Sequence, residues 1–206
     1  MYVKVWKRFL DILISLLVFP FFVILYVIVG AAILCDDHGP IFYKADRLGK
    51  GGRIFKMYKF RSMKVNAPDL RNADGTTFNS RNDSRVTRVG QVLRRTSIDE
   101  VPQIINVIKG DMSFVGPRPD LPDAMNIYSE KDKNKLKVLP GITGYSQAYY
   151  RNASTLEQRF AGDSYYADHL SFIMDAKIIV KSFHTVLTRK NVYRNGEEDE
   201  ASHRSV

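Results

Sequence analysis

An uncharged apolar segment near the N-terminus places the strongest limit on how this chain can fold. Residues 12–35, which lie between Asp11 and Asp36, are 24 consecutive positions without a charge. About 20 apolar residues are enough to cross the hydrocarbon core of a bilayer. A cleavable signal peptide fits less well, because the run is longer than a usual signal core and no small-residue cleavage site precedes Asp36. The sequence therefore predicts a membrane-embedded unit at residues 1–36.

Pro20 divides this apolar segment into two unequal arms. A proline inside a helix removes a backbone hydrogen bond and clashes with the preceding turn, so a kink is expected there. The arm before Pro20 has eight uncharged residues, and at about 1.5 Å per residue it cannot cross a core of about 30 Å. Basic residues flank both ends, so the positive-inside rule selects no topology. We predict a re-entrant helix-break-helix with both ends on the cytoplasmic face, and a single bitopic span is the alternative.

The composition limits the partners and the metal chemistry. The 206 residues carry a formal net charge of +9, which favours anionic lipid headgroups, nucleotide phosphates or nucleic acid as partners without choosing among them. The single cysteine, Cys35, excludes an intrachain disulfide and a cysteine-built zinc site. The histidines show no ligand spacing. Any metal should therefore be a hard cation held by carboxylates and phosphates.

The remaining chain is predicted to form one α+β, mainly helical domain over residues 37–190, followed by a disordered polar tail at 191–206. Alternating apolar and basic residues around a glycine-rich turn predict a small β-hairpin over 41–63. The polar stretch at 64–83 predicts a long loop. Helices are predicted at residues 85–95, from about 97 to 109, near 128–139 and over 165–190. The last of these is basic and amphipathic, which suits either an anionic membrane surface or a core helix with a solvated face.

One short stretch, residues 94–103, places two adjacent carboxylates at a predicted helix start. Pro102 is tolerated only near the beginning of a helix, so the helix should begin at about Ser97 to Asp99. Asp99 and Glu100 then lie at the positive end of the helix dipole. Ser97 and Glu100 also match a capping box, so ordinary helix capping is the alternative interpretation.

A second feature is an arginine between two prolines. Pro117 and Pro119 fix their own backbone and restrict the residues before them, which holds Arg118 extended. An arginine held in this way presents a planar fork to a phosphate or a nucleobase edge. A surface turn arginine is the alternative.

Four motifs in order resemble the bacterial sugar transferases, the monotopic phosphoglycosyl transferases that initiate glycoconjugate assembly. The motifs occupy residues 56–63, 97–103, 109–119 and 140–144. The resemblance covers the chain from the apolar segment to about residue 190. It implies amphipathic interfacial helices around a catalytic core on the cytoplasmic face of the bacterial inner membrane.

The resemblance also implies a covalent two-step reaction. A sugar-1-phosphate passes from a UDP-sugar to undecaprenyl phosphate through an aspartyl-phosphosugar, giving UMP and an undecaprenyl diphosphate sugar for a capsule, exopolysaccharide, O-antigen or glycoprotein glycan. Asp99 matches the nucleophile and Glu100 its acidic partner, with Mg²⁺ held by this pair at the diphosphate. The positions that match substrate-binding residues are Lys59, Arg118, Arg151 and Asn152.

The chain departs from the family pattern at two places. Phe19-Pro20 stands where close small relatives have Ser-Pro, so a kink there depends on Pro20 alone. Tyr149 and Tyr150 replace the familiar Asn-Gly before Arg151, which bears on sugar specificity. The Arg-Asn-Ala order at 151–153 resembles members that act on acetamido sugars. The resemblance is compatible with a homodimer.

The high positive charge motivates a competing class, a membrane-tethered basic binding protein for nucleic acid or anionic lipid. Such proteins usually carry a recognisable module, and the sequence has no helix-turn-helix or zinc pattern. We therefore expect an enzyme and no nucleic-acid partner.

Overall fold

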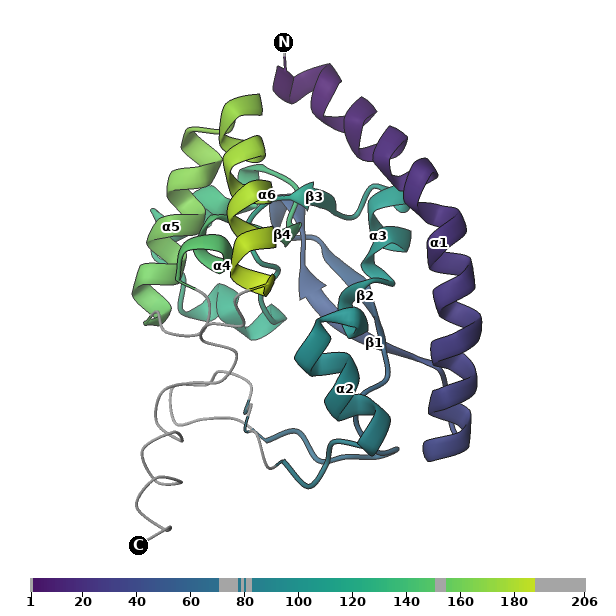
Figure 1. Ribbon diagram of the computed structural model, residues 1–206. Helices are drawn as coiled ribbons and strands as arrows, with labels where there is room; N and C mark the ends of the chain where they lie inside the picture. The colour runs from purple at the N-terminus through teal and green to yellow at the C-terminus, as the bar shows by residue number, and fades with distance from the viewer. Residues whose placement is uncertain (1, 71–77, 79, 81–82, 151–154, 188–206) are drawn as a thin grey trace, which may run out of the picture.

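A single long helix, α1 (Lys7–Asp36), contains the whole apolar segment and follows a π-helical turn at Tyr2–Trp6. The computed structural model describes residues 2–70, 78, 80, 83–150 and 155–187. Figure 1 shows that α1 runs along one side of the domain and bends as it does so. Pro20 lies inside the helix, which continues through it. The expected separation into two helices is not seen. The re-entrant topology stays a prediction.

One face of α1 is buried against the domain over the full length of the helix. Its buried residues recur at helical spacing: Lys7, Asp11, Ser15, Phe22, Val29, Gly30 and Ile33. The apolar ones among them join a core with Phe60, Leu93 and Ile104. The remaining faces expose large apolar side chains. Within the described part of the chain, α1 is the one helix long and apolar enough to cross a membrane.

The predicted β-hairpin is confirmed. β1 (Phe42–Leu48) pairs antiparallel with β2 (Ile54–Phe60) across the short turn at Lys50–Gly52. On one face of the hairpin, Phe42 stacks on Tyr26 of α1 with ring centres 5.3 Å apart. On the other face, Phe55 and Met57 pack against Val107. Because side chains alternate along a strand, Lys59 lies on the same face as Met57 and points away from α1.

The acidic pair does not lie in an α-helical first turn as predicted. The chain forms α2 (Arg88–Thr96), a 3₁₀ turn at Ile98–Glu100, and then α3 (Gln103–Lys109). Ser97 has a left-handed backbone with φ of 59° and ends α2. Its side chain makes no capping hydrogen bond. The alternative interpretation, a capping box, is therefore wrong, because Ser97 ends one helix and its side chain does not cap the next.

The second half of the domain combines a small parallel sheet with three helices. β3 (Ser113–Val115) pairs with β4 (Gly141–Thr143). A 3₁₀ segment at Pro122–Asn126 lies between them, and a second 3₁₀ segment at Asp132–Lys137 stands in place of the helix predicted near 128–139. The helices α4 (Tyr145–Tyr149), α5 (Leu156–Asp168) and α6 (Phe172–Leu187) follow (Figure 1).

The single helix predicted over 165–190 is instead the end of α5 followed by α6. Tyr166 of α5 and Ile178 of α6 are both fully buried in the same cluster. The chain must reverse between these residues for both to reach that cluster. The described residues of the 64–83 loop belong to no helix or strand, and the predicted tail at 191–206 lies outside the described residues.

Candidate functional site

The 3₁₀ turn Ile98–Glu100 brings the acidic pair against strand β2. Asp99 is buried, with 9% of its surface exposed, and Glu100 is partly exposed. Lys59 of β2 donates a hydrogen bond from Nζ to Oε1 of Glu100 at 2.6 Å. The predicted residues Lys59, Asp99 and Glu100 therefore come together from segments 40 positions apart.

Local sequence explains why the carboxylates face this way. Ile98 and Val101 pack against the core that α1 shares with the domain, and Pro102 is buried at the start of α3. The apolar side chains of the turn thus point inward. Asp99 and Glu100 are left to face the strand that carries Lys59.

Burial and positive charge act in opposite directions on Glu100. Burial alone would raise the pKa of this carboxyl, but the positive charges of Lys59, Arg118 and Arg47 together hold the pKa below its usual value. These three cations approach from β2, from the Pro117-Arg118-Pro119 segment and from β1. The site therefore collects positive charge around one carboxylate.

Asp99 has the reverse balance. Burial raises the pKa of Asp99 to about 6, and the negative charge of Glu100 adds to this, while Lys59 and Arg94 oppose it. Arg94 lies in the last turn of α2 and donates from Nε to Ser62 Oγ at 2.9 Å. A buried carboxylate next to a second acid and several cations is an environment typical of functional carboxyl groups.

Arg118 is exposed, and its guanidinium has no hydrogen-bond partner among the residues that the structure describes. The same side chain contributes to the positive field at Glu100. An arginine with free donors beside an acidic pair is suited to bind an anion such as a phosphate. Arg151 and Asn152, the other predicted substrate-binding residues, lie outside the described residues.

A metal ion would need ligands from a substrate as well as from the protein. The described ranges contain no group of three or more His, Cys, Asp or Glu side chains that could hold a metal. Asp99 and Glu100 are two adjacent oxygen donors. Mg²⁺ commonly binds through one or two carboxylates plus substrate phosphates, so this donor set fits Mg²⁺ that arrives with a diphosphate.

Arg47 is a site residue that was not predicted from the sequence. In the hairpin, Arg47 pairs with Phe55 and Tyr43 pairs with Lys59, so Arg47 and Lys59 lie on the same face of the sheet. The alternation of residues along the strand indicates which face of the hairpin Arg47 lies on. The pairing register of the two strands is also needed to place Arg47 on the same face as Lys59.

The fold and site define a class: a domain fixed to a long apolar helix, with an acidic pair amid cations suited to a phosphate-bearing substrate. A family model described as bacterial sugar transferase matches residues 2–189. The chain belongs to this family, and it is a transferase of the phosphoglycosyl transferase kind.

Three relatives illustrate the similarity of this chain to known sugar transferases. The chain is 41% identical over 153 residues to the uncharacterized sugar transferase EpsL of Bacillus subtilis, covering 74% of this chain and 73% of that protein. It is 37% identical to a UDP-N-acetylgalactosamine-undecaprenyl-phosphate N-acetylgalactosaminephosphotransferase of Aeromonas hydrophila, over 88% of this chain and 44% of that protein. It is 36% identical to a UDP-glucose:undecaprenyl-phosphate glucose-1-phosphate transferase of Caulobacter vibrioides, over 91% and 72%.

Proposed function

We propose that the protein transfers a sugar-1-phosphate from a UDP-sugar to undecaprenyl phosphate, through a phosphosugar bound covalently to Asp99. The observation that carries the proposal is the buried position of Asp99 beside Glu100, whose Oε1 is held by Lys59. The Aeromonas and Caulobacter relatives are named as enzymes that use undecaprenyl phosphate. The product would begin the synthesis of a polysaccharide or another glycoconjugate.

In the first step, a carboxylate oxygen of Asp99 forms a bond to the β-phosphorus of the UDP-sugar. The bond from that phosphorus to the bridging oxygen breaks, and UMP leaves with this oxygen and its electron pair. In the second step, an oxygen of undecaprenyl phosphate attacks the same phosphorus, and the bond to Asp99 breaks. Both steps balance in charge, and the carboxylate is restored.

The other groups neutralise and orient the diphosphate. Lys59 fixes Glu100 through Oε1, and Arg118 has donors available for phosphate oxygens. Arg94 lies close enough to Asp99 to lower its pKa. Mg²⁺, held by Asp99 and Glu100 together with the diphosphate, would supply further neutralisation of charge on the phosphates. With these cations in place, the attack of one anion on another becomes feasible.

The exposed apolar surface supports a location at a membrane, and we propose the cytoplasmic face of the inner membrane, as the family resemblance implies. α1 exposes apolar side chains on every face that the domain does not cover. On α6, Phe172, Ile173, Val180 and Phe183 are 59–70% exposed, with Lys177 and Lys181 between them in sequence. A helix with this pattern can lie in the headgroup region of an anionic membrane. The acceptor, undecaprenyl phosphate, would present its phosphate at the same depth.

The identity of the sugar is a separate proposal. The Aeromonas and Caulobacter relatives are named for N-acetylgalactosamine and glucose, and a 38% identical relative from Salmonella typhimurium is named for galactose. Family membership therefore leaves the sugar open. The Arg-Asn-Ala order at 151–153 leads us to propose an acetamido sugar. Parallel assays with UDP-N-acetylgalactosamine, UDP-galactose and UDP-glucose would test this, and preference for a sugar without the acetamido group would contradict it.

The covalent mechanism predicts UMP release without an acceptor. Detergent-solubilised protein mixed with excess UDP-sugar and Mg²⁺ should release about one equivalent of UMP per active enzyme molecule in a rapid burst, measured by quenched-flow chromatography. Asp99→Asn should abolish the burst, because its amide cannot act as the nucleophile. Asp46→Asn, which alters an exposed carboxylate paired with Lys56 at 2.8 Å, should keep it. UMP that appears only after undecaprenyl phosphate is added would rule out the covalent intermediate.

A further inference from the structure

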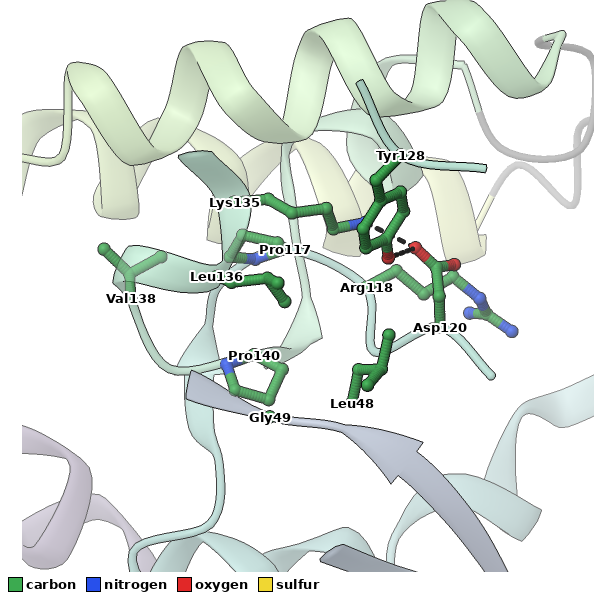
Figure 2. Close-up of a pocket in the computed structure, with 10 residues that line it drawn as sticks. All are labelled: Leu48, Gly49, Pro117, Arg118, Asp120, Tyr128, Lys135, Leu136, Val138 and Pro140. Atoms are coloured by element: carbon green, nitrogen blue, oxygen red, sulfur yellow. Dashed lines mark hydrogen bonds and ion pairs between the residues drawn. The ribbon is translucent and has the colours of Figure 1, made fainter. Parts of the chain in front are cut away.

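A buried cluster of charged groups lies next to the segment that carries Arg118. Lys135 is 3% exposed, and its Nζ donates to Asp120 Oδ2 at 2.7 Å and to Asp163 Oδ2 at 2.6 Å. The hydroxyl of Tyr128 donates to the same oxygen of Asp120 at 2.7 Å. Figure 2 shows Tyr128 and Lys135 converging on the carboxylate of Asp120. We call these four residues the Lys135 cluster.

Asp120 lies two positions after Arg118, so the Lys135 cluster holds one end of the arginine segment. The backbone holds both ends as well: Gly141 N donates to Pro117 O at 2.9 Å, and Leu48 N donates to Asp120 O at 2.9 Å. In Figure 2 the Arg118 side chain lies beside Asp120, and its guanidinium points away from the hydrogen-bonded group. The backbone of Arg118 is thus fixed on both sides, whereas its donors stay available.

The second carboxylate of the cluster connects it to the helical part of the domain. Asp163 of α5 accepts from Ser146 Oγ of α4 at 2.8 Å through its other oxygen. A buried charge network of this kind is costly to desolvate and is a weak source of stability. Its geometric effect is specific, because it fixes Asp120 relative to two helices. The desolvation cost of these buried charges is consistent with a role for Asp120 in the geometry of the site.

We propose that the Lys135 cluster is the positioning device for Arg118, and that it sets this arginine for the nucleoside diphosphate part of the donor. The inference rests on the proposed function, in which Arg118 binds the diphosphate or nucleotide. Asp120 and Tyr128 act through the arginine and touch no substrate. Loosening Asp120 therefore weakens nucleotide binding without changing the chemistry at Asp99.

Tyr128→Phe is the sharpest probe, because it removes one hydroxyl from Asp120 and leaves Lys135 paired. Arg159 of α5, whose Nη2 lies 3.3 Å from Asp120 Oδ1, also stays, so the change weakens the hold on Asp120 without removing its cations. We expect the Kd for UDP, measured by titration calorimetry on the full-length protein in detergent, to rise about tenfold. The KM for the UDP-sugar should rise by a similar factor, and kcat should stay within about twofold. In an Arg118→Ala background, Tyr128→Phe should change the Kd less than about twofold further, because the group it positions is gone.

Tyr2→Phe is the control. The hydroxyl of Tyr2 also donates to a carboxylate, Asp175 Oδ2, at 2.6 Å, and this carboxylate is not next to Arg118 in the chain. Tyr166 is unsuitable, because its hydroxyl also donates to Val115 O, close to the arginine segment. Loss of that hydroxyl should lower the melting temperature and leave the Kd for UDP unchanged. An equal rise in Kd in both tyrosine variants would show that the effect is general destabilisation and would overturn the inference.

The remaining outcomes separate this inference from the proposed function. Full additivity of Tyr128→Phe and Arg118→Ala would overturn the positioning role, even if the wild type releases UMP normally. An unchanged Kd in Arg118→Ala would also overturn it. UDP binding that follows the expected double-mutant pattern, with no UMP burst from the wild type, would support the positioning role and contradict the covalent mechanism.

Discussion

At the scale of single residues, Asp99 is a carboxylate placed where its charge is unfavourable. Its pKa is raised from 3.8 to about 6, mainly by burial. The folded protein therefore binds this proton more tightly than the unfolded chain. The resulting stability is fully present below pH 3.8 and is lost as the pH rises through about 6. At pH 8 the ionised group should lower the free energy of unfolding by up to about 3 kcal/mol.

Asp99→Asn should consequently stabilise the protein while it abolishes activity. In the presence of EDTA, we expect a melting temperature several degrees above that of the wild type at pH 8 and close to it at pH 4. Differential scanning fluorimetry of the two proteins across this pH range would measure the difference. Asp46→Asn, at an exposed position, should show no such gain at pH 8. A wild type as stable as Asp99→Asn at pH 8 would mean that burial of this charge costs nothing.

A site residue could be predicted from the sequence where its neighbours in the chain identify it, and could not be predicted where its role depends on contacts with distant residues. Local motifs are enough to identify three site residues: the adjacent acids Asp99 and Glu100, and Arg118 between its two prolines. Arg47 has no local motif, and its place beside the site depends on the register of the hairpin. Asp120 and Lys135 are 15 residues apart, and nothing in their immediate neighbours indicates that they pair.

At the scale of elements, the start of α1 is held to the domain by a buried ion pair. Lys7 Nζ lies 2.6 Å from Asp175 Oδ2 of α6, with side chains 11% and 7% exposed. The hydroxyls of Tyr2 and Tyr166 donate to the same carboxylate. In the next turn, Asp11 Oδ1 accepts from the Ser113 hydroxyl at 3.0 Å. The start of α1 is thus joined to both α6 and β3 by polar groups.

Lys7→Met should be strongly destabilising, because it leaves Asp175 buried without its cation. We expect a loss of about 3–5 kcal/mol in the free energy of unfolding, measured by denaturant titration in detergent micelles. Lys56→Met is the matched control, since Lys56 pairs with Asp46 at 2.8 Å but both side chains are about half exposed. That change should cost less than about 1 kcal/mol. Equal losses would show that burial gives the α1 pair no special importance.

Element boundaries were harder to predict than element types. The hairpin was predictable, because alternation and a glycine turn are both local signals. The acidic turn was not, because nothing in the sequence marks the left-handed backbone of Ser97 that ends α2. The break between α5 and α6 likewise follows from Tyr166 and Ile178 packing into one cluster, which is a tertiary requirement.

At the scale of the whole molecule, the packing of α1 bears on how the protein sits in a membrane. The sequence shows an apolar run of spanning length, but it does not reveal that one face is covered from Lys7 to Ile33. Figure 1 shows the domain beside both halves of the helix. A helix that crossed the bilayer in this arrangement would draw the charged domain into the hydrocarbon core, where unpaired polar groups are costly. A helix that enters one leaflet, with the domain at the surface, avoids that cost.

The packing therefore predicts that both ends of α1 lie on the same side of the membrane, and the family resemblance predicts that this is the cytoplasmic side. In a Cys35→Ser background, single cysteines at Val5, which is 58% exposed, and at Lys50, which is exposed, would flank the helix. A membrane-impermeant maleimide should label neither in intact cells and both in inverted vesicles. A cysteine in a loop of another protein that is known to face the periplasm should be labelled in intact cells, which would control for access of the reagent. Labelling of the two cysteines from opposite sides, with Lys50→Cys accessible from the outside if the domain is external, would establish a bitopic span. α1 would then have to separate from the domain along much of its length.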